Sequence, residues 1–105
     1  GDDPAALFRA DGECELRTLS PLQLEKHIEF YAIRISPGAA LASEAHFEGT
    51  REMFSVARGA AVIVAGGSSI ELDEGDTAHY RADAPHAIRC AGTEPLEGYL
   101  IVSYR

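Results

Sequence analysis

The amino-acid sequence predicts an all-β domain that closes into a barrel or a sandwich. Most of its apolar residues fall in segments of strand length, either alternating with polar residues or forming short runs. Each segment ends at Gly, Pro or a polar cluster, the residue types that favour turns. Helical spacing is weak and confined to residues 4–10 and 21–26, so we expect little helix. About seven to nine short strands with closely spaced turns are typical of such folds, because closure removes exposed sheet edges.

The first half of the chain contains two clear strand segments. Residues 13–19 alternate, with Cys14 and Leu16 on one face, and stop before a Ser-Pro pair. Residues 28–35 carry apolar side chains on both faces, which suits a strand that is covered on both sides. A Pro-Gly pair ends this second strand.

The second half of the chain predicts a β-meander. The pair Gly66-Gly67 separates two apolar segments and tolerates the positive φ angles of a tight hairpin turn. Further breaks are expected at residues 74–76 and 83–85. The predicted strands are residues 52–57, 60–65, 77–80, 86–90 and 98–104, with a further segment around Ile70.

The length of 105 residues allows one hydrophobic core. With 46% hydrophobic and 25% charged residues, the composition is that of a folded globular protein. We divide the chain into residues 1–26, an N-terminal arm and first strand packing on the barrel, and residues 27–105, the barrel itself. The sequence begins at Gly1 and has no initiator Met, which is expected of a processed protein or of a piece of a longer one.

Composition excludes several classes of function. A net charge of −8 repels a phosphate backbone, so direct binding to nucleic acid is not expected. No apolar run approaches the roughly 18 residues that span a bilayer, and no basic n-region precedes an apolar h-region at the start of the sequence, so we expect a cytoplasmic protein with no membrane partner. Cys14 and Cys90 are too few for a disulfide scaffold and are predicted to be free thiols.

Two carboxylates and two imidazoles are the candidate metal ligands: Glu44, His46, Glu52 and His86. Their oxygen and nitrogen donors suit a divalent transition metal such as Zn, Mn, Fe or Ni. Glu44 and His46 are one residue apart, so on a strand they point to the same face. Glu52 starts the next predicted strand, where it can lie opposite them across a hairpin, and only a closed fold brings in His86. The alternative is hydrogen-bonded histidines without metal and solvated surface carboxylates.

The spacing of the first three candidates resembles the first motif of the cupin superfamily, G-x5-H-x-H-x3-4-E-x6-G. The corresponding pattern here is Gly38-x5-Glu44-x-His46-x5-Glu52-x6-Gly59. Glu44 stands where the family has its first His. The gap between His46 and Glu52 is one residue longer than in the family.

The segment around His86 resembles the second cupin motif, G-x5-P-x-G-x2-H-x3-N. Gly75 and His86 are kept, whereas Arg81, Asp83 and Cys90 stand in place of Pro, Gly and Asn. The resemblance implies a double-stranded β-helix, or jelly-roll barrel. The resemblance also implies that Glu44, His46, Glu52 and His86 are metal ligands, because they occupy the ligand positions of the two motifs.

The barrel would enclose a pocket for one small ligand. Tyr31, Phe54, Tyr80 and Ile88 are the predicted ligand-binding residues. The inward-facing wall is predicted to consist of these four together with Ile33, Val56 and Ile101.

The chain resembles most the cupin domain that follows an N-terminal helix-turn-helix domain in bacterial transcriptional regulators of the XRE type. This resemblance implies a sensor of a small-molecule effector, a homodimer, and contact with DNA only through a domain absent from this chain. A rival interpretation is a metal-dependent cupin enzyme of the dioxygenase or isomerase type, in which Glu44 is a fourth ligand or a general base. A third is a metal-free binding protein.

Overall fold

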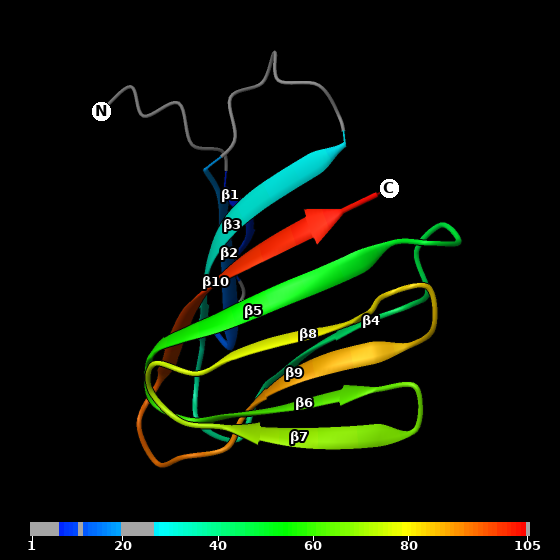
Figure 1. Ribbon diagram of the computed structural model, residues 1–105. Helices are drawn as coiled ribbons and strands as arrows, with labels where there is room; N and C mark the ends of the chain where they lie inside the picture. The colour runs from blue at the N-terminus through cyan, green and yellow to red at the C-terminus, as the bar shows by residue number, and fades with distance from the viewer. Residues whose placement is uncertain (1–6, 11, 20–26, 105) are drawn as a thin grey trace.

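The chain forms two antiparallel sheets, seen in Figure 1, the computed structural model of the protein, which describes residues 7–10, 12–19 and 27–104. Within these residues there are ten strands and no helix. The strands are β1 (Leu7–Ala10), β2 (Cys14–Thr18), β3 (Ile28–Ile35), β4 (Ala40–Ser43), β5 (Arg51–Arg58), β6 (Ala61–Ala65), β7 (Ser68–Leu72), β8 (Thr77–Arg81), β9 (His86–Cys90) and β10 (Leu96–Ser103). None of the described segments is a helix long and apolar enough to span a membrane.

The strand order shows the jelly-roll arrangement that the resemblance implies. One sheet has six strands in the order β1-β2-β3-β10-β5-β8, and the other has four in the order β4-β9-β6-β7. Consecutive strands repeatedly change sheets, so β4 pairs with β9 and β10 lies between β3 and β5 (Figure 1). Residues far apart in the chain therefore meet between the sheets.

Alternation along the strands builds the core. In β5 every second residue is buried, because successive side chains of a strand point to opposite faces. Both sheets contribute to the core, which includes the fully buried side chains of Phe54 and Leu96 from the six-stranded sheet and of Ile63 and Ile88 from the four-stranded sheet. Burying each such side chain contributes about 1.5–3 kcal/mol.

Two sequence-based expectations at the N-terminal end need comment. The weak helical turn at residues 4–10 is wrong for Leu7–Ala10, which pairs with β2 as a strand. Pairing with an existing sheet edge outweighs weak helical spacing in so short a segment. The turn predicted at residues 21–26 lies outside the described residues. Cys14 and Cys90 are buried and form no disulfide, as predicted.

Gly98 marks a close approach between strands. A Cβ at this position would lie 2.4 Å from the Ser55 carbonyl oxygen and 2.6 Å from the Phe54 ring. The register of β10 against β5 shifts between Glu97 and Gly98. Only a residue without a side chain fits there without displacing backbone.

We therefore expect Gly98→Ala to lower the free energy of unfolding by about 1–3 kcal/mol, the usual cost of overpacking. Urea unfolding followed by circular dichroism measures the difference. Gly92→Ala is the matched control, because its Cβ would meet nothing closer than 3.8 Å. Equal effects of the two substitutions would contradict the assignment of Gly98 as a packing constraint.

Candidate functional site

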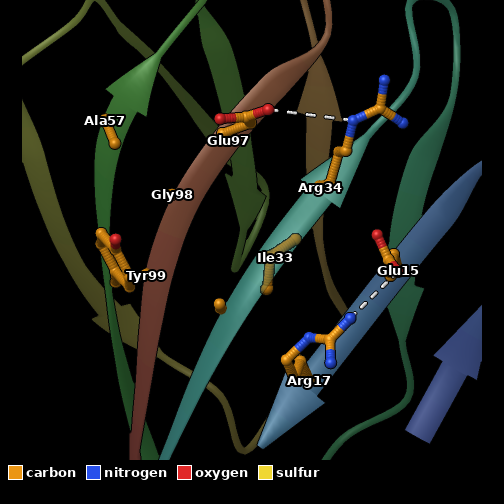
Figure 2. A pocket seen from close by; sticks show the side chains of 9 residues that line it. Glu15, Arg17, Ile33, Arg34, Ala57, Glu97, Gly98 and Tyr99 are labelled. Atoms are coloured by element: carbon orange, nitrogen blue, oxygen red, sulfur yellow. Dashed lines mark ion pairs between the residues drawn. The ribbon is translucent and has the colours of Figure 1, made fainter. Parts of the chain in front are cut away.

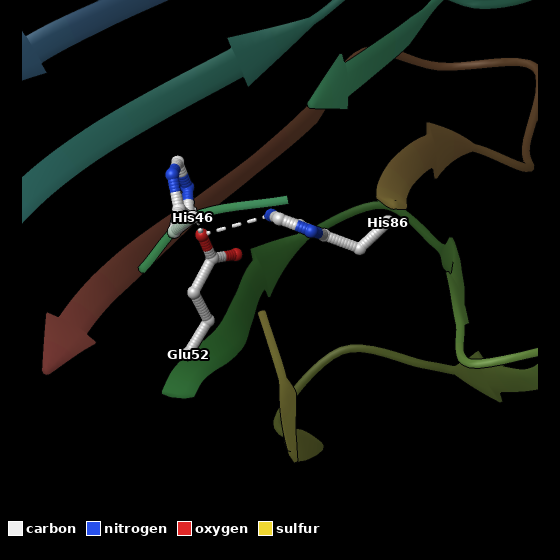
Figure 3. A group of neighbouring side chains, drawn as sticks. All are labelled: His46, Glu52 and His86. Carbon is white, nitrogen blue, oxygen red and sulfur yellow. Dashed lines mark hydrogen bonds and ion pairs between the residues drawn. The ribbon is translucent and has the colours of Figure 1, made fainter. Parts of the chain in front are cut away.

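Three of the four predicted ligands meet at one end of the space between the sheets. Glu52 is on β5, His86 begins β9, and His46 lies on the loop after β4. One nitrogen or oxygen from each lies within 4.8 Å of the others. Figure 3 shows the Glu52 carboxylate between the two imidazole rings. Its Oε2 lies 3.1 Å from Nε2 of His86 and 3.4 Å from Nε2 of His46.

The route by which these residues meet differs from the sequence-based expectation. Strand β4 ends at Ser43, so Glu44 and His46 lie in a loop and do not share a strand face. Glu52 does not lie across a hairpin from them either, because β4 and β5 belong to different sheets. The site joins the six-stranded sheet, through Glu52, to the four-stranded sheet, through His86. Glu44 is exposed and is not part of the three-residue group; it lines an adjoining hollow that also includes His86.

Glu52 is a buried carboxylate with both oxygens engaged. Its side chain is only 4% exposed. Oε1 accepts a hydrogen bond of 2.8 Å from the Tyr80 hydroxyl, and Oε2 faces the two histidines. Burial and the nearby charge of Glu52 raise the pKa of Tyr80, so its phenol keeps its proton as a donor. Tyr80 thereby fixes the orientation of the carboxylate.

His86 is held in one tautomer by its second ring nitrogen. Nδ1 lies 2.8 Å from the carbonyl oxygen of Ala84, and a carbonyl only accepts, so Nδ1 carries a hydrogen and donates it. In a neutral ring Nε2 then carries a lone pair, which faces the Glu52 carboxylate at 3.1 Å. Two acceptors at this distance repel unless a proton or a metal cation lies between them. This is the arrangement of a ligating histidine oriented by a backbone carbonyl.

The loop that carries His46 is tied to the segment before His86. The His46 amide donates to the Ala82 carbonyl at 2.9 Å, and the Gly49 amide donates to Oδ2 of Asp83 at 2.8 Å. Arg81 holds the same carboxylate through two hydrogen bonds of 3.0 Å. These hydrogen bonds lower the pKa of Asp83 to about 2, and those from Arg81 have a larger effect than that from Gly49.

The three residues fit a divalent transition metal. They offer two imidazole nitrogens and one carboxylate oxygen, the donor set of many Zn, Mn and Fe sites. The separations of 3.1 and 3.4 Å suit two ligands that each bind one ion at about 2.0–2.2 Å. The His46 side chain is 35% exposed, so the site is open to solvent on that side.

The histidines and Glu52 form part of the wall of a cavity of about 210 Å³. This is below the roughly 300–1,000 Å³ of pockets for drug-sized ligands, so the space suits a small molecule. Most of the remaining wall is apolar and comes from both sheets: Leu16, Leu41, Ile88, Leu100 and Val102.

The predicted ligand-binding residues occupy different places. Tyr31 and Ile88 line the cavity. Phe54 is fully buried in the core, and Tyr80 lies behind Glu52, so neither is part of the cavity wall. Ile101 was expected to face inward, but its neighbours Leu100 and Val102 do so instead, because adjacent residues of a strand alternate.

Sequence reasoning missed a second polar group in the cavity. Oε1 of Glu29 accepts hydrogen bonds from the hydroxyls of Tyr31, at 2.6 Å, and Tyr104, at 3.0 Å. All three residues line the cavity. The available signal was the alternation of residues 28–35, which places Glu29 on the same face as Tyr31. Burial, followed by the hydrogen bond to Glu29, raises the pKa of Tyr104 to about 12.

A second hollow lies on the six-stranded sheet (Figure 2). It contains the surface ion pairs Arg17–Glu15, at 3.6 Å, and Arg34–Glu97, at 3.8 Å. These four side chains are 39–49% exposed, and exposed pairs of this kind contribute little to stability or recognition. No histidine or cysteine lines this hollow. It therefore offers no comparable chemistry.

Comparison with known proteins matches residues 31–102 of the chain to the family described as the cupin domain. No curated protein sequence matches. Among solved structures, the chain is similar to the cupin domain of an XRE family transcriptional regulator from Enterobacter cloacae, with a TM-score of 0.80 and 23% identity over 88% of this chain and 97% of that one.

A second structure is an HTH_3 family transcriptional regulator from Vibrio cholerae, with a TM-score of 0.80 and 25% identity over 89% of this chain. The match covers 52% of the Vibrio protein, so this chain spans about half of its length. The Cnp3 cupin domain of Schizosaccharomyces pombe has a TM-score of 0.75 at 11% identity, over 93% of this chain and 67% of that one.

The link between Asp83 and the His46 loop gives a prediction about acid stability. Because the pKa of Asp83 falls from 3.8 to about 2 on folding, its contribution is complete above about pH 4 and is lost as the pH falls through about 2. Asp83→Asn should therefore unfold at lower urea than the parent protein at pH 5. Below pH 2 the two midpoints should converge. A difference that is constant with pH would contradict the assignment.

Proposed function

This chain belongs to the cupin domain family, and on that premise we propose that it senses a small molecule for a bacterial transcriptional regulator. The observation that carries the proposal is the small cavity between the sheets, with polar groups at His46, Glu52, His86 and Glu29. Its apolar walls and few polar groups are typical of small-ligand sites. The likeness to cupin domains of helix-turn-helix regulators supports a sensing role.

We propose that DNA contact belongs to a separate helix-turn-helix domain of the regulator. The net charge of −8 makes this domain a poor partner for phosphates, so the two tasks would be divided. The regulator would act in the cytoplasm as a homodimer. The outer face of the six-stranded sheet exposes Ile28, Phe30 and Tyr99, an apolar area that suits a second copy of the chain.

Effector binding would act by shifting the population of molecules between two arrangements of the sheets. A ligand in the cavity contacts residues of both sheets, so it stabilises the arrangement of the sheets that fits it best. In a dimer, that arrangement would set the distance between two DNA-binding domains and therefore their fit to operator half-sites. The ligand changes this equilibrium only by the difference between its affinities for the two arrangements.

We also propose that His46, Glu52 and His86 hold a divalent ion, Zn, Mn, Fe or Ni. The support is the lone pair of His86 facing a buried carboxylate, a contact that a cation would make favourable. Such an ion supplies a Lewis acid to which an oxygen or nitrogen of the effector can bind. Tyr80 keeps Glu52 turned toward the histidines, and the Ala84 carbonyl does the same for His86.

A metal-dependent cupin enzyme remains the second candidate. The specific observation in its favour is the donor set itself, because two histidines and one carboxylate with open positions also occur in non-haem iron oxygenases. The half-open His46 side would admit a substrate. This candidate and the sensor share the same metal site, so metal binding alone does not separate them.

Metal analysis tests the three-residue site. Plasma mass spectrometry of the purified protein is expected to give about one transition-metal ion per chain. A His46→Ala/His86→Ala variant should lose it. Two controls should keep it: His79→Ala, an exposed histidine of β8, and Glu44→Ala, which lies outside the group. Loss of metal in the Glu44 variant would show that the fourth predicted ligand takes part, and a metal-free parent would overturn the metal proposal.

The reading frame of the gene separates the sensor from the enzyme. We expect it to encode a helix-turn-helix domain joined to this domain, as in the Vibrio protein whose length this chain half covers. Sequencing the whole transcript decides the matter. A transcript that encodes this domain alone would contradict the regulator and favour the enzyme.

A further inference from the structure

The charges in the cavity wall are one-sided. Glu29 and Glu52 both line the cavity, whereas no Lys or Arg is among its lining residues in the part of the chain that the structure describes. Glu52 faces His46 and His86. Among the described residues, Glu29 has only the phenols of Tyr31 and Tyr104 as side-chain hydrogen-bond partners. Within the described residues, the cavity therefore contains one carboxylate with no basic side chain as its partner.

Glu29 offers one oxygen to a ligand. The Tyr31 and Tyr104 hydroxyls both donate to Oε1, and no described residue donates to Oε2. Burial, then the hydrogen bond to Glu29, raises the pKa of both phenols, so both remain protonated donors near neutral pH. The two tyrosines thus hold the carboxylate in place while its second oxygen stays available.

An anionic ligand is disfavoured by this arrangement. Near Glu29 it would meet a carboxylate in a half-buried site that has no Lys or Arg among its described lining residues, and low polarity strengthens the repulsion between the two negative charges. A positively charged group gains in the same place, because it forms a charge-assisted hydrogen bond with Oε2. The tyrosine rings add aromatic faces, which also favour cations.

We propose that the effector is a small primary amine whose ammonium group binds Oε2 of Glu29. Its carbon chain lies along the apolar wall formed by Leu41, Ile88 and Leu100, toward the end that holds His46, Glu52 and His86. A cavity of about 210 Å³ limits this chain to a few carbons. This inference rests on the proposed use of the cavity as an effector site, and it adds the chemical class of the effector.

Isothermal titration calorimetry with probes of equal carbon number tests the inference. The probes are butylamine, 1,4-diaminobutane, 1-butanol and butanoate, each titrated at pH 7 into the protein as purified and after chelator treatment. The two amines are expected to bind at least tenfold more tightly than butanol and butanoate. This comparison uses the unsubstituted protein and so does not depend on the folding of a variant.

Substitution of Glu29 then locates the ammonium. Glu29→Gln keeps an oxygen that accepts from Tyr31 and Tyr104 but removes the charge, so amine affinity should fall at least tenfold with unchanged metal content. Glu71→Gln, which makes the same change on an exposed position of β7, should leave affinity unaltered. An equal fall in both variants, or no fall in either, would overturn the role of Glu29.

The outcomes separate the two proposals. If butanol or butanoate binds as tightly as the amines, the amine class is wrong and the cavity remains an effector site. If no probe of any charge binds, the amine class is wrong and the proposed sensing role loses its support. Metal content, measured separately, is independent of both results.

Discussion

The buried carboxylate of Glu52 is the constraint on which this end of the molecule depends. A charge removed from water is costly unless donors or a cation compensate it. Tyr80 donates to one oxygen, while His46 and His86 converge on the other. The strand that carries Glu52 pairs with β8 on one side and with β10 on the other, so the carboxylate cannot move out to solvent without disturbing both pairings.

The departures from the cupin motifs have a physical use in this chain. Arg81 and Asp83 replace residues of the second motif, and together they hold the Gly49 amide of the first. A side-chain bond between the two motif segments thus accompanies the backbone bond between Ala82 and His46. The extra residue between His46 and Glu52 lies in the loop that these bonds fix, so the longer spacing still allows the two side chains to meet.

Most of the fold could be predicted because it depends on local alternation. Residues 28–35 and 86–90 form strands with the predicted bounds, since a Pro-Gly pair follows the first segment and Pro85 directly precedes the second. The contribution of β4 to a separate sheet could not be predicted, because four residues without strong alternation contain no information about their partner strand. Leu7–Ala10 is likewise a strand only because β2 provides an edge for it.

The site residues that belong to a family motif could be predicted from their spacing. Those that meet only through the pairing of distant strands could not. His46, Glu52 and His86 meet as that pattern implies, although Glu44 does not join them. Glu29 and Tyr104 are 75 positions apart and meet only because β3 pairs with β10, which no local signal reports.

The position of the three-residue group relative to Gly98 has a mechanical consequence. Glu52 and His86 belong to opposite sheets, so their contact joins the two sheets at this end of the barrel. Four residues further along β5, Val56 pairs with Gly98, where a Cβ would collide with the Ser55 carbonyl oxygen and the Phe54 ring. The close packing at Gly98 therefore stiffens the six-stranded sheet itself, whereas the contact between Glu52 and His86 links this sheet to the other one, so a change at that contact alters the distance between the two sheets.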